Sequence, residues 1–263
     1  MGKIVVAFDL YGTLLSTESI AKELASHFGQ ETAASIATVW RKYQLEYTWR
    51  LNSMSTYGPD FRNPCKAQKE QPDHADAVSA KEKYDDFFKV TRNALLHALA
   101  EHGVGLEDQA LDKLMLAYDS LSTFPDVNPA LERLRDNSNV ECVVFSNGTH
   151  AMVTNSVNGS QDLDSSVLKG TVSIDDIRIY KPAPETYHHL ARKTGKENEM
   201  DKVWLISGNP FDITGARTVG MQTAWVDRAG NGWQDRLGLG PTVVVKSLEE
   251  VAEAVERHAK STA

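Results

Sequence analysis

The chain has little cysteine, no long apolar segment and no excess of basic residues. Its two cysteines, Cys65 and Cys142, form no CxxC or Cys/His spacing, so we expect free thiols in a reducing compartment, with a disulfide as the alternative. No apolar run approaches the roughly 18 residues of a membrane span. With 28 basic and 36 acidic residues the net charge is −8, which argues against a surface for nucleic acid or anionic lipid.

The composition is that of an ordinary globular protein. Hydrophobic residues make up 41% of the 263 residues and charged residues 24%. Only a short apolar stretch precedes Asp9 near the N-terminus, which is too short for a secretory signal. We therefore expect a cytoplasmic protein, with a length between one large domain and two small ones.

Five short apolar runs predict the strands of a parallel sheet. A run that is apolar throughout is typical of a strand covered on both faces. The runs lie at residues 4–8, 140–145, 203–206, 223–226 and 242–245. Helical patterns separate the later runs, at residues 129–136, 184–193 and 212–219. This alternation predicts an α/β fold, a Rossmann-like doubly wound sheet with right-handed crossovers.

Residues 16–121 do not follow this alternation and contain no convincing strand. Helical patterns dominate there, at residues 19–28, 31–57, 84–102 and 107–121. A single crossover does not need this length, so we predict an all-helical domain inserted into a core domain of residues 1–15 and 122–263. Within the insert, residues 58–83 hold three prolines and many charges, and we expect an exposed loop excursion.

Polar side chains follow the predicted strands at the sheet edge where parallel strands present their carboxyl ends. Ligands of open parallel sheets bind at this edge. The polar residues there are Asp9, Thr13, Ser146, Asn147, Lys181, Ser207, Asn209 and Asp212. Taken singly, Asp212 is well explained as a helix N-cap and Lys181 as a surface lysine. Their joint placement instead predicts an active site.

Four of these segments resemble the motifs of the haloacid dehalogenase superfamily. The segments are residues 8–14 (FDLYGTL), 146–148 (SNG), 181–182 (KP) and 207–212 (SGNPFD). Within the superfamily the chain looks like the type II (L-)2-haloacid dehalogenases, because residues 40–49 (WRKYQLEYTW) resemble the signature of their helical cap. The resemblance implies a Rossmann-like core with a helical cap domain.

The resemblance also implies a reaction. Asp9 would be the nucleophile that displaces halide from a 2-haloalkanoic acid and forms an ester, which water hydrolyses to a 2-hydroxy acid. Asp212 would orient or activate that water with the help of Asn209. Lys181 would keep Asp9 ionised, and Ser207 would hydrogen-bond the lysine or the nucleophile.

Further residues would hold the nucleophile and the substrate. Arg41 would bind the halide, the substrate carboxylate or both, the alternatives being an ion pair with a local acid such as Glu46 or a solvated position on a helix surface. Ser146 and Asn147 would bind the substrate carboxylate. The remaining candidates are Thr13 beside Asp9, Tyr187 beside Lys181, and Tyr11, Leu45, Trp49, Phe87 and Phe211 around an apolar pocket. For Tyr187, Leu45, Trp49 and Phe87, packing in a core is the alternative.

The sequence departs from the superfamily's phosphatases at two points. Their second aspartate is replaced by Tyr11, and Gly208 and Asn209 stand where acidic Mg²⁺ ligands are expected. We therefore expect no metal or cofactor, with a small 2-halo acid and water as the partners. Gly208 and Phe211 also replace the Ser and Trp usual in the dehalogenases.

Alternatives to a dehalogenase remain open at the level of the sequence. One is a hydrolase or phosphatase of the same fold that acts on a non-halogenated small acid. Another is a non-catalytic member of the fold, which the joint presence of Asp9, Lys181 and Asp212 opposes. A homodimer is expected from the resemblance alone.

Overall fold

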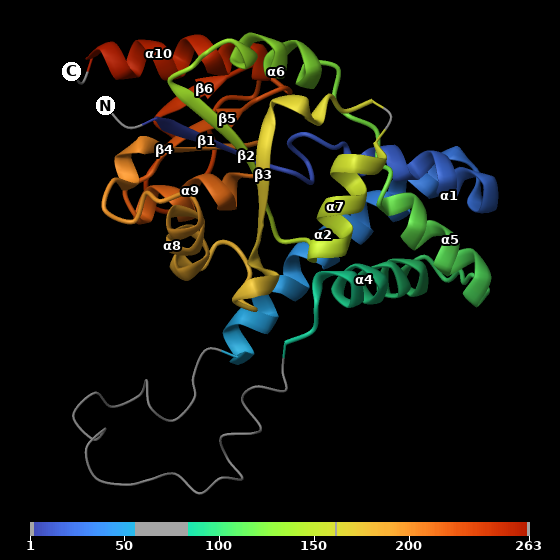
Figure 1. Cartoon of the computed structure of the whole chain (residues 1–263). Helices are drawn as coiled ribbons and strands as arrows, with labels where there is room; N and C mark the ends of the chain where they lie inside the picture. Colours follow the sequence, from blue (N-terminus) through green and yellow to red (C-terminus); the bar gives the residue numbers. More distant parts are fainter. Residues whose placement is uncertain (1–2, 56–83, 161, 262–263) are drawn as a thin grey trace, which may run out of the picture.

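A six-stranded parallel sheet forms the centre of the protein (Figure 1). The computed structural model describes residues 3–55, 84–160 and 162–261. The strand order is β3-β2-β1-β4-β5-β6. In chain order the strands are β1 (Ile4–Asp9), β2 (Val140–Ser146), β3 (Leu168–Ser173), β4 (Val203–Ser207), β5 (Gln222–Val226) and β6 (Val243–Val245). The predicted Rossmann-like α/β fold is confirmed.

The strand β1 lies between β2 and β4, so its apolar side chains are covered on both faces. Residues 5–8 are buried, as the continuous apolar run predicts. The register pairs Asp9 with Phe145 of β2 and Phe8 with Ile206 of β4. The ends of three neighbouring strands therefore meet around Asp9.

The edge strand β3 is missing from the sequence prediction. Its segment begins Leu168-Lys169-Gly170-Thr171 and exposes Lys169, Gly170 and Thr171 to solvent. A search for continuous apolar runs detects only strands that are covered on both faces, so it passes over such an edge strand.

One helix leads into β2, and four helices follow β2 and connect or cover the strands. They are α6 (Val127–Arg135), α7 (His150–Gly159), α8 (Pro184–Lys193), α9 (Pro210–Thr218) and α10 (Val251–Ser261). Figure 1 shows α6 and α10 together at one end of the molecule, and α8 beside α9. The prediction matches α8 and is one or two residues off for α6 and α9, while α7 and α10 were not predicted.

The segment between β1 and β2 is helical, as predicted, and we call it the helical insert. Its helices are α1 (Ala21–Phe28), α2 (Gln30–Ser55), α4 (Phe87–Glu101) and α5 (Asp108–Tyr118), preceded by a 3₁₀ turn at Thr17–Ile20. The long helix α2 packs against both α1 and α4. It buries Ile36, Trp40, Gln44 and Thr48, four residues apart on one face. Two of these four are polar.

The predictions of a loop excursion and of free cysteines concern residues that the structure covers only in part. The loop excursion at residues 58–83, which includes Cys65, lies outside the described residues. Cys142 is a buried free thiol in β2, and burial raises its pKa to about 12. Within the described residues, no helix is both long and apolar enough to cross a membrane.

Candidate active site

The carboxylate of Asp9 lies at the end of β1 and accepts hydrogen bonds from four side chains. Its Oδ2 atom is 2.7 Å from Thr13 Oγ1, 2.7 Å from Asn209 Nδ2 and 3.4 Å from Ser207 Oγ. Its Oδ1 atom is 3.1 Å from Lys181 Nζ. Asp9 is only 6% exposed. Four residues predicted from three separate motifs thus surround one buried carboxylate.

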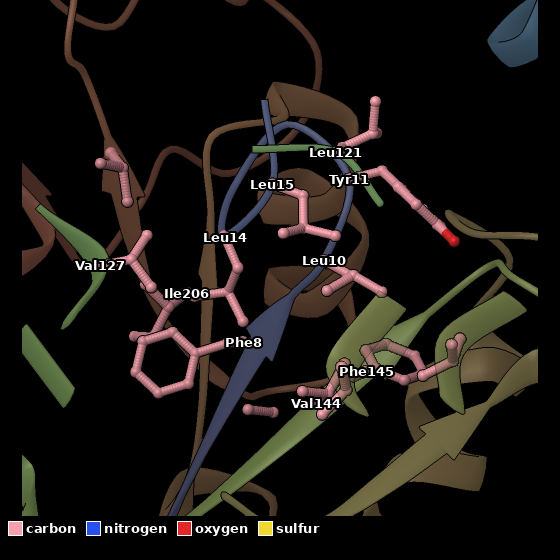
Figure 2. Packing of buried hydrophobic residues seen from close by; sticks show 14 of the residues in the cluster. Phe8, Leu10, Tyr11, Leu14, Leu15, Leu121, Val127, Val144, Phe145 and Ile206 are labelled. Carbon is pink, nitrogen blue, oxygen red and sulfur yellow. The ribbon is translucent and has the colours of Figure 1, made fainter. Parts of the chain in front are cut away.

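The loop after β1 is held rigidly, which fixes the position of Asp9. The carbonyl oxygen of Leu10 accepts hydrogen bonds from the backbone amides of Thr13, Leu14 and Leu15. The three leucines are fully buried. Figure 2 shows them gathered near Phe8 and Phe145, with the Tyr11 ring extending away from them. A loop with this packing presents the Asp9 carboxylate in one orientation.

The ammonium group of Lys181 bridges Asp9 and Asp212. Lys181 Nζ lies 3.1 Å from Asp9 Oδ1, 2.9 Å from Asp212 Oδ2 and 2.8 Å from the carbonyl oxygen of Phe145. An ammonium has three hydrogens, so these acceptors satisfy all of them. Lys181 is 1% exposed, and its interpretation as a surface lysine is wrong.

The carboxylate of Asp212 is fully buried in the first turn of α9 and is not a helix cap. Its Oδ1 atom accepts a hydrogen bond from Tyr187 Oη at 2.8 Å, while Oδ2 accepts from Lys181. Burial raises the pKa of Asp212 to about 6, against the opposing effect of the Lys181 charge. Burial also raises the pKa of Tyr187 well above its usual value, so its hydroxyl stays a donor.

A glycine leaves room for this tyrosine. A Cβ atom on Gly215 of α9 would lie 2.4 Å from Tyr187 Oη, a distance that excludes any larger residue at the present spacing. Packing in a core, the alternative interpretation of Tyr187, therefore does not account for the contact that its hydroxyl makes. Tyr187 is buried in α8, and its hydroxyl reaches the Asp212 carboxylate.

Arg41 of α2 connects the helical insert to the strand ends. Its Nη2 atom donates to the backbone oxygen of Tyr11 and to Asn209 Oδ1, both at 3.1 Å, and its Nη1 atom donates to Gln44 Oε1 at 2.7 Å. The alternative pairing with Glu46 is wrong, because Glu46 pairs with Arg50 at 3.3 Å. Asn209 thus joins the guanidinium of Arg41 to the Asp9 carboxylate.

Ser146 and Asn147 brace the loop after β2. Asn147 Oδ1 accepts from the backbone amide of Lys181 at 3.0 Å, and Ser146 Oγ accepts from the amide of Gly148 at 3.0 Å. Both residues are buried. Their predicted contact with a substrate carboxylate remains a prediction, since the structure shows them engaged with the chain itself.

Tyr11 and Phe87 pack where the helical insert meets the core. Their ring centroids lie 5.7 Å apart in a stacked arrangement, and the Tyr11 hydroxyl lies 3.3 Å from Ser156 Oγ of α7. Burial raises the pKa of Tyr11 far above its usual value, which keeps this hydroxyl neutral. Phe87 is 1% exposed and belongs to the apolar core, as its alternative interpretation expects.

An open pocket of about 760 Å³ lies beside Asn209, between α2 and α9. Leu45 and Phe211, two residues of the predicted apolar pocket, line it, and the Trp49 ring meets Phe211 edge-on with centroids 5.6 Å apart. The other lining residues are Asn52, Ser53, Pro182, Ala183, Pro210, Thr214, Asp235 and Leu237. Its walls are mostly apolar, which suits a small organic molecule.

Nothing in the sequence predicted the roles of Gln44 and the backbone oxygen of Phe145, or the close approach at Gly208. Gln44 is fully buried and holds Arg41, yet nothing distinguishes it from other polar residues of a helix except its spacing of three from Arg41. The backbone oxygen of Phe145 lies next to Asp9 because the register of β1 and β2 pairs these two residues. A backbone acceptor leaves no trace in the side-chain pattern.

The donor set does not fit a divalent cation. The Asp9 and Asp212 oxygens that face each other are occupied by the ammonium of Lys181. Within the described residues, no three His, Cys, Asp or Glu side chains are grouped as a metal site. Mg²⁺ prefers several oxygen ligands in octahedral geometry, and the described residues here gather too few free carboxylate oxygens for it.

Comparison with known proteins identifies the family. The model of the haloacid dehalogenase-like hydrolases matches residues 5–220. The chain belongs to this hydrolase family. It is 31% identical to (S)-2-haloacid dehalogenase 4A of Burkholderia cepacia over 224 residues, covering 85% of this chain and 83% of the relative. It is 29% identical to an (S)-2-haloacid dehalogenase of Pseudomonas fluorescens, covering 93% of each chain.

A solved structure of this family has the same architecture. It is an L-2-haloacid dehalogenase from Xanthobacter autotrophicus with chloropropionic acid covalently bound. The two chains superpose with a TM-score of 0.78 at 25% identity, covering 97% of this chain and 99% of the other. The haloacid dehalogenase-like hydrolase described here thus shares its α/β core and helical insert.

Proposed function

We propose that this hydrolase converts short 2-haloalkanoic acids to 2-hydroxy acids through an ester on Asp9. The observation that carries the proposal is the Asp9 carboxylate itself, buried at a strand end between the Lys181 ammonium and the side chain of Asn209. A carboxylate held in this way is oriented for attack on a bound carbon atom. The names of the relatives support this choice of substrate.

In the first step an Asp9 carboxylate oxygen attacks the α-carbon of the substrate. A carbon–oxygen bond forms, the carbon–halogen bond breaks with inversion, and the halide leaves with its electron pair. Arg41 supplies the positive charge for the halide or the substrate carboxylate. Asn209 places that guanidinium close to the nucleophile because it bonds to both.

In the second step water attacks the carbonyl carbon of the ester. Asp212 accepts a proton from this water, which suits a carboxylate with a pKa of about 6 at neutral pH. The bond between that carbon and the ester oxygen then breaks. The leaving alkoxide takes the proton from Asp212, which yields the 2-hydroxy acid. The second proton of the water remains on the Asp9 carboxyl group and is released to solvent, which restores the Asp9 carboxylate.

The test is halide release from L-2-chloropropionate by the purified protein. We expect turnover by the wild type and a loss on the order of 10³-fold or more in Asp9→Asn, which lacks the nucleophilic oxygen. Asp112→Asn makes the same change on the exposed surface of α5 and should keep full activity. Failure of the wild type to release halide from several short 2-halo acids would refute the proposal.

The rival assignment is a Mg²⁺-dependent phosphatase of the same family. It predicts phosphate release from p-nitrophenyl phosphate that requires Mg²⁺ and stops with a chelator. We expect none, and we expect halide release to be unchanged by the chelator.

A further inference from the structure

The Arg41 guanidinium is held only by neutral oxygen atoms. Its three acceptors are the Tyr11 backbone oxygen, the Asn209 amide oxygen and the Gln44 amide oxygen. Among residues 3–55, 84–160 and 162–261, no carboxylate lies within 4.0 Å of the guanidinium. Within the described residues its positive charge therefore forms no direct ion pair, which favours a bound anion.

Gln44 is built into the helical insert so that its oxygen faces Arg41. Gln44 Nε2 donates to Thr91 Oγ1 of α4 at 2.7 Å, and the Thr91 hydroxyl donates to the backbone oxygen of Phe87 at 2.6 Å. Because that hydroxyl hydrogen is used, Thr91 Oγ1 can only accept from Gln44. On its other side, Gln44 Oε1 accepts from both Arg41 Nη1 and Tyr118 Oη.

This network fixes the amide in one orientation. A flip would set the Gln44 NH₂ group against the guanidinium and the Tyr118 hydroxyl, and would leave buried donors without acceptors. Gln44 is 0% exposed, so water does not replace these partners. Burial also raises the pKa of Tyr118 above its usual value, so that its hydroxyl remains a donor to Gln44.

We propose that Gln44 is a positioning residue that anchors Arg41 without neutralising its charge, so that the guanidinium binds the anion of the substrate. This inference rests on the proposed function, because it assigns Arg41 to the substrate anion. A carboxylate at the same position would hold Arg41 at least as firmly but would cancel the charge. The neutrality of the amide, as well as its hydrogen bond, is therefore what the site requires.

The test compares two variants that separate the hydrogen bond from the charge. Gln44→Glu keeps the shape and an oxygen for Arg41 but adds a negative charge. Gln44→Met keeps the length, removes the hydrogen bond and adds no charge. We measure the affinity of L-lactate, an anionic 2-hydroxy acid, by isothermal titration calorimetry with each folded protein. Gln30→Glu, on the exposed start of the same helix α2, is the matched control.

We expect weaker L-lactate binding in both variants, with the larger loss, on the order of tenfold or more, in Gln44→Glu. A purely structural role predicts the reverse order, because Gln44→Glu loses only the donor to Thr91 and preserves the hydrogen bond to Arg41, whereas Gln44→Met loses both. Unchanged affinity in Gln44→Glu, a loss smaller than in Gln44→Met, or no L-lactate binding by the wild type would overturn the inference.

A third variant acts from outside the site. Thr91→Val has nearly the same shape but removes the acceptor of Gln44 Nε2, so that the amide is held less firmly against Arg41. We expect weaker L-lactate binding here too, and wild-type affinity would contradict the inference. Since these measurements need no turnover, a wild type that binds L-lactate but releases no halide would refute only the proposed function.

Discussion

The ammonium of Lys181 lies 2.9 Å from the Asp212 carboxylate, and both groups are almost completely shielded from solvent. The same ammonium contacts Asp9, so one cation holds two carboxylates inside the protein. This cluster of one ammonium and two carboxylates is stable only when all three charges are present, because a buried charge without a partner costs folding free energy.

Replacement of the lysine is therefore expected to destabilise the fold in a pH-dependent way. In Lys181→Met the two carboxylates face each other without a cation, and their pKa values rise above those of the unfolded chain. The folded state then binds more protons than the unfolded state, so its stability falls as the pH rises. Urea unfolding should show a loss of about 3 kcal/mol at pH 8 and a smaller loss at pH 5.

Lys113→Met, an exposed change on α5, is the control for the lysine variant. It should have nearly the wild-type free energy of unfolding at both pH values. A loss in Lys181→Met that is the same at pH 5 and pH 8 would mean that the buried carboxylates do not titrate as described.

The pH dependence of turnover should report Asp212. Because the base must be ionised, kcat is expected to fall as the pH falls through about 6, the pKa to which burial raises this carboxyl. Tyr187→Phe removes a hydrogen bond that favours the ionised form, so the acid limb of the profile should move to higher pH by up to about one unit.

A matched tyrosine separates this effect from a general loss of packing. The Tyr84 hydroxyl donates to Asp175 at 2.9 Å, outside the site, and Tyr84→Phe should leave the acid limb in place. If the profiles of Tyr187→Phe and the wild type coincide at saturating 2-halo acid, Asp212 is not the titrating base.

The spacing of two loops at the site depends on Gly208. A Cβ atom there would lie 2.6 Å from the backbone oxygen of Gly12, and neither group is the end of a flexible side chain. Gly208→Ala should push the loop of Asn209 away from the loop of Asp9, with at least a tenfold loss of kcat/KM and about 1 to 3 kcal/mol of stability.

Gly105→Ala is the control for the glycine variant, since a Cβ at Gly105 meets no atom within 4 Å. Halide release and urea unfolding of both variants provide the measurement. Wild-type kinetics in Gly208→Ala would show that the two loops accommodate the added Cβ atom, and the prediction would be wrong.

Much of the fold was predictable because its central strands are apolar on both faces. The runs at β1, β2 and β4 mark such strands directly, and the polar residues that follow them meet because parallel strands share one edge. The edge strand β3 escaped because three of its residues are exposed. Helix α8 was predicted to the residue, since Pro184 marks its first turn.

The site was predictable as a set of residues but only partly as a set of contacts. Motif positions indicated that Asp9, Lys181 and Asp212 belong together. They did not show that Asn147 is engaged with the Lys181 backbone, or that Gln44 anchors Arg41. Such contacts depend on how helices of the insert pack against the core, which spacing along one chain does not encode.

The central claim is that Asp9 forms the ester, and oxygen labelling tests it most directly. The protein in molar excess is allowed one turnover of L-2-chloropropionate in ¹⁸O-water, and the peptide containing Asp9 and the product are then weighed by mass spectrometry. Hydrolysis at the ester carbonyl predicts one ¹⁸O atom in Asp9 and an unlabelled 2-hydroxy acid. Label in the hydroxyl group of the first product, with none in Asp9, would contradict the account.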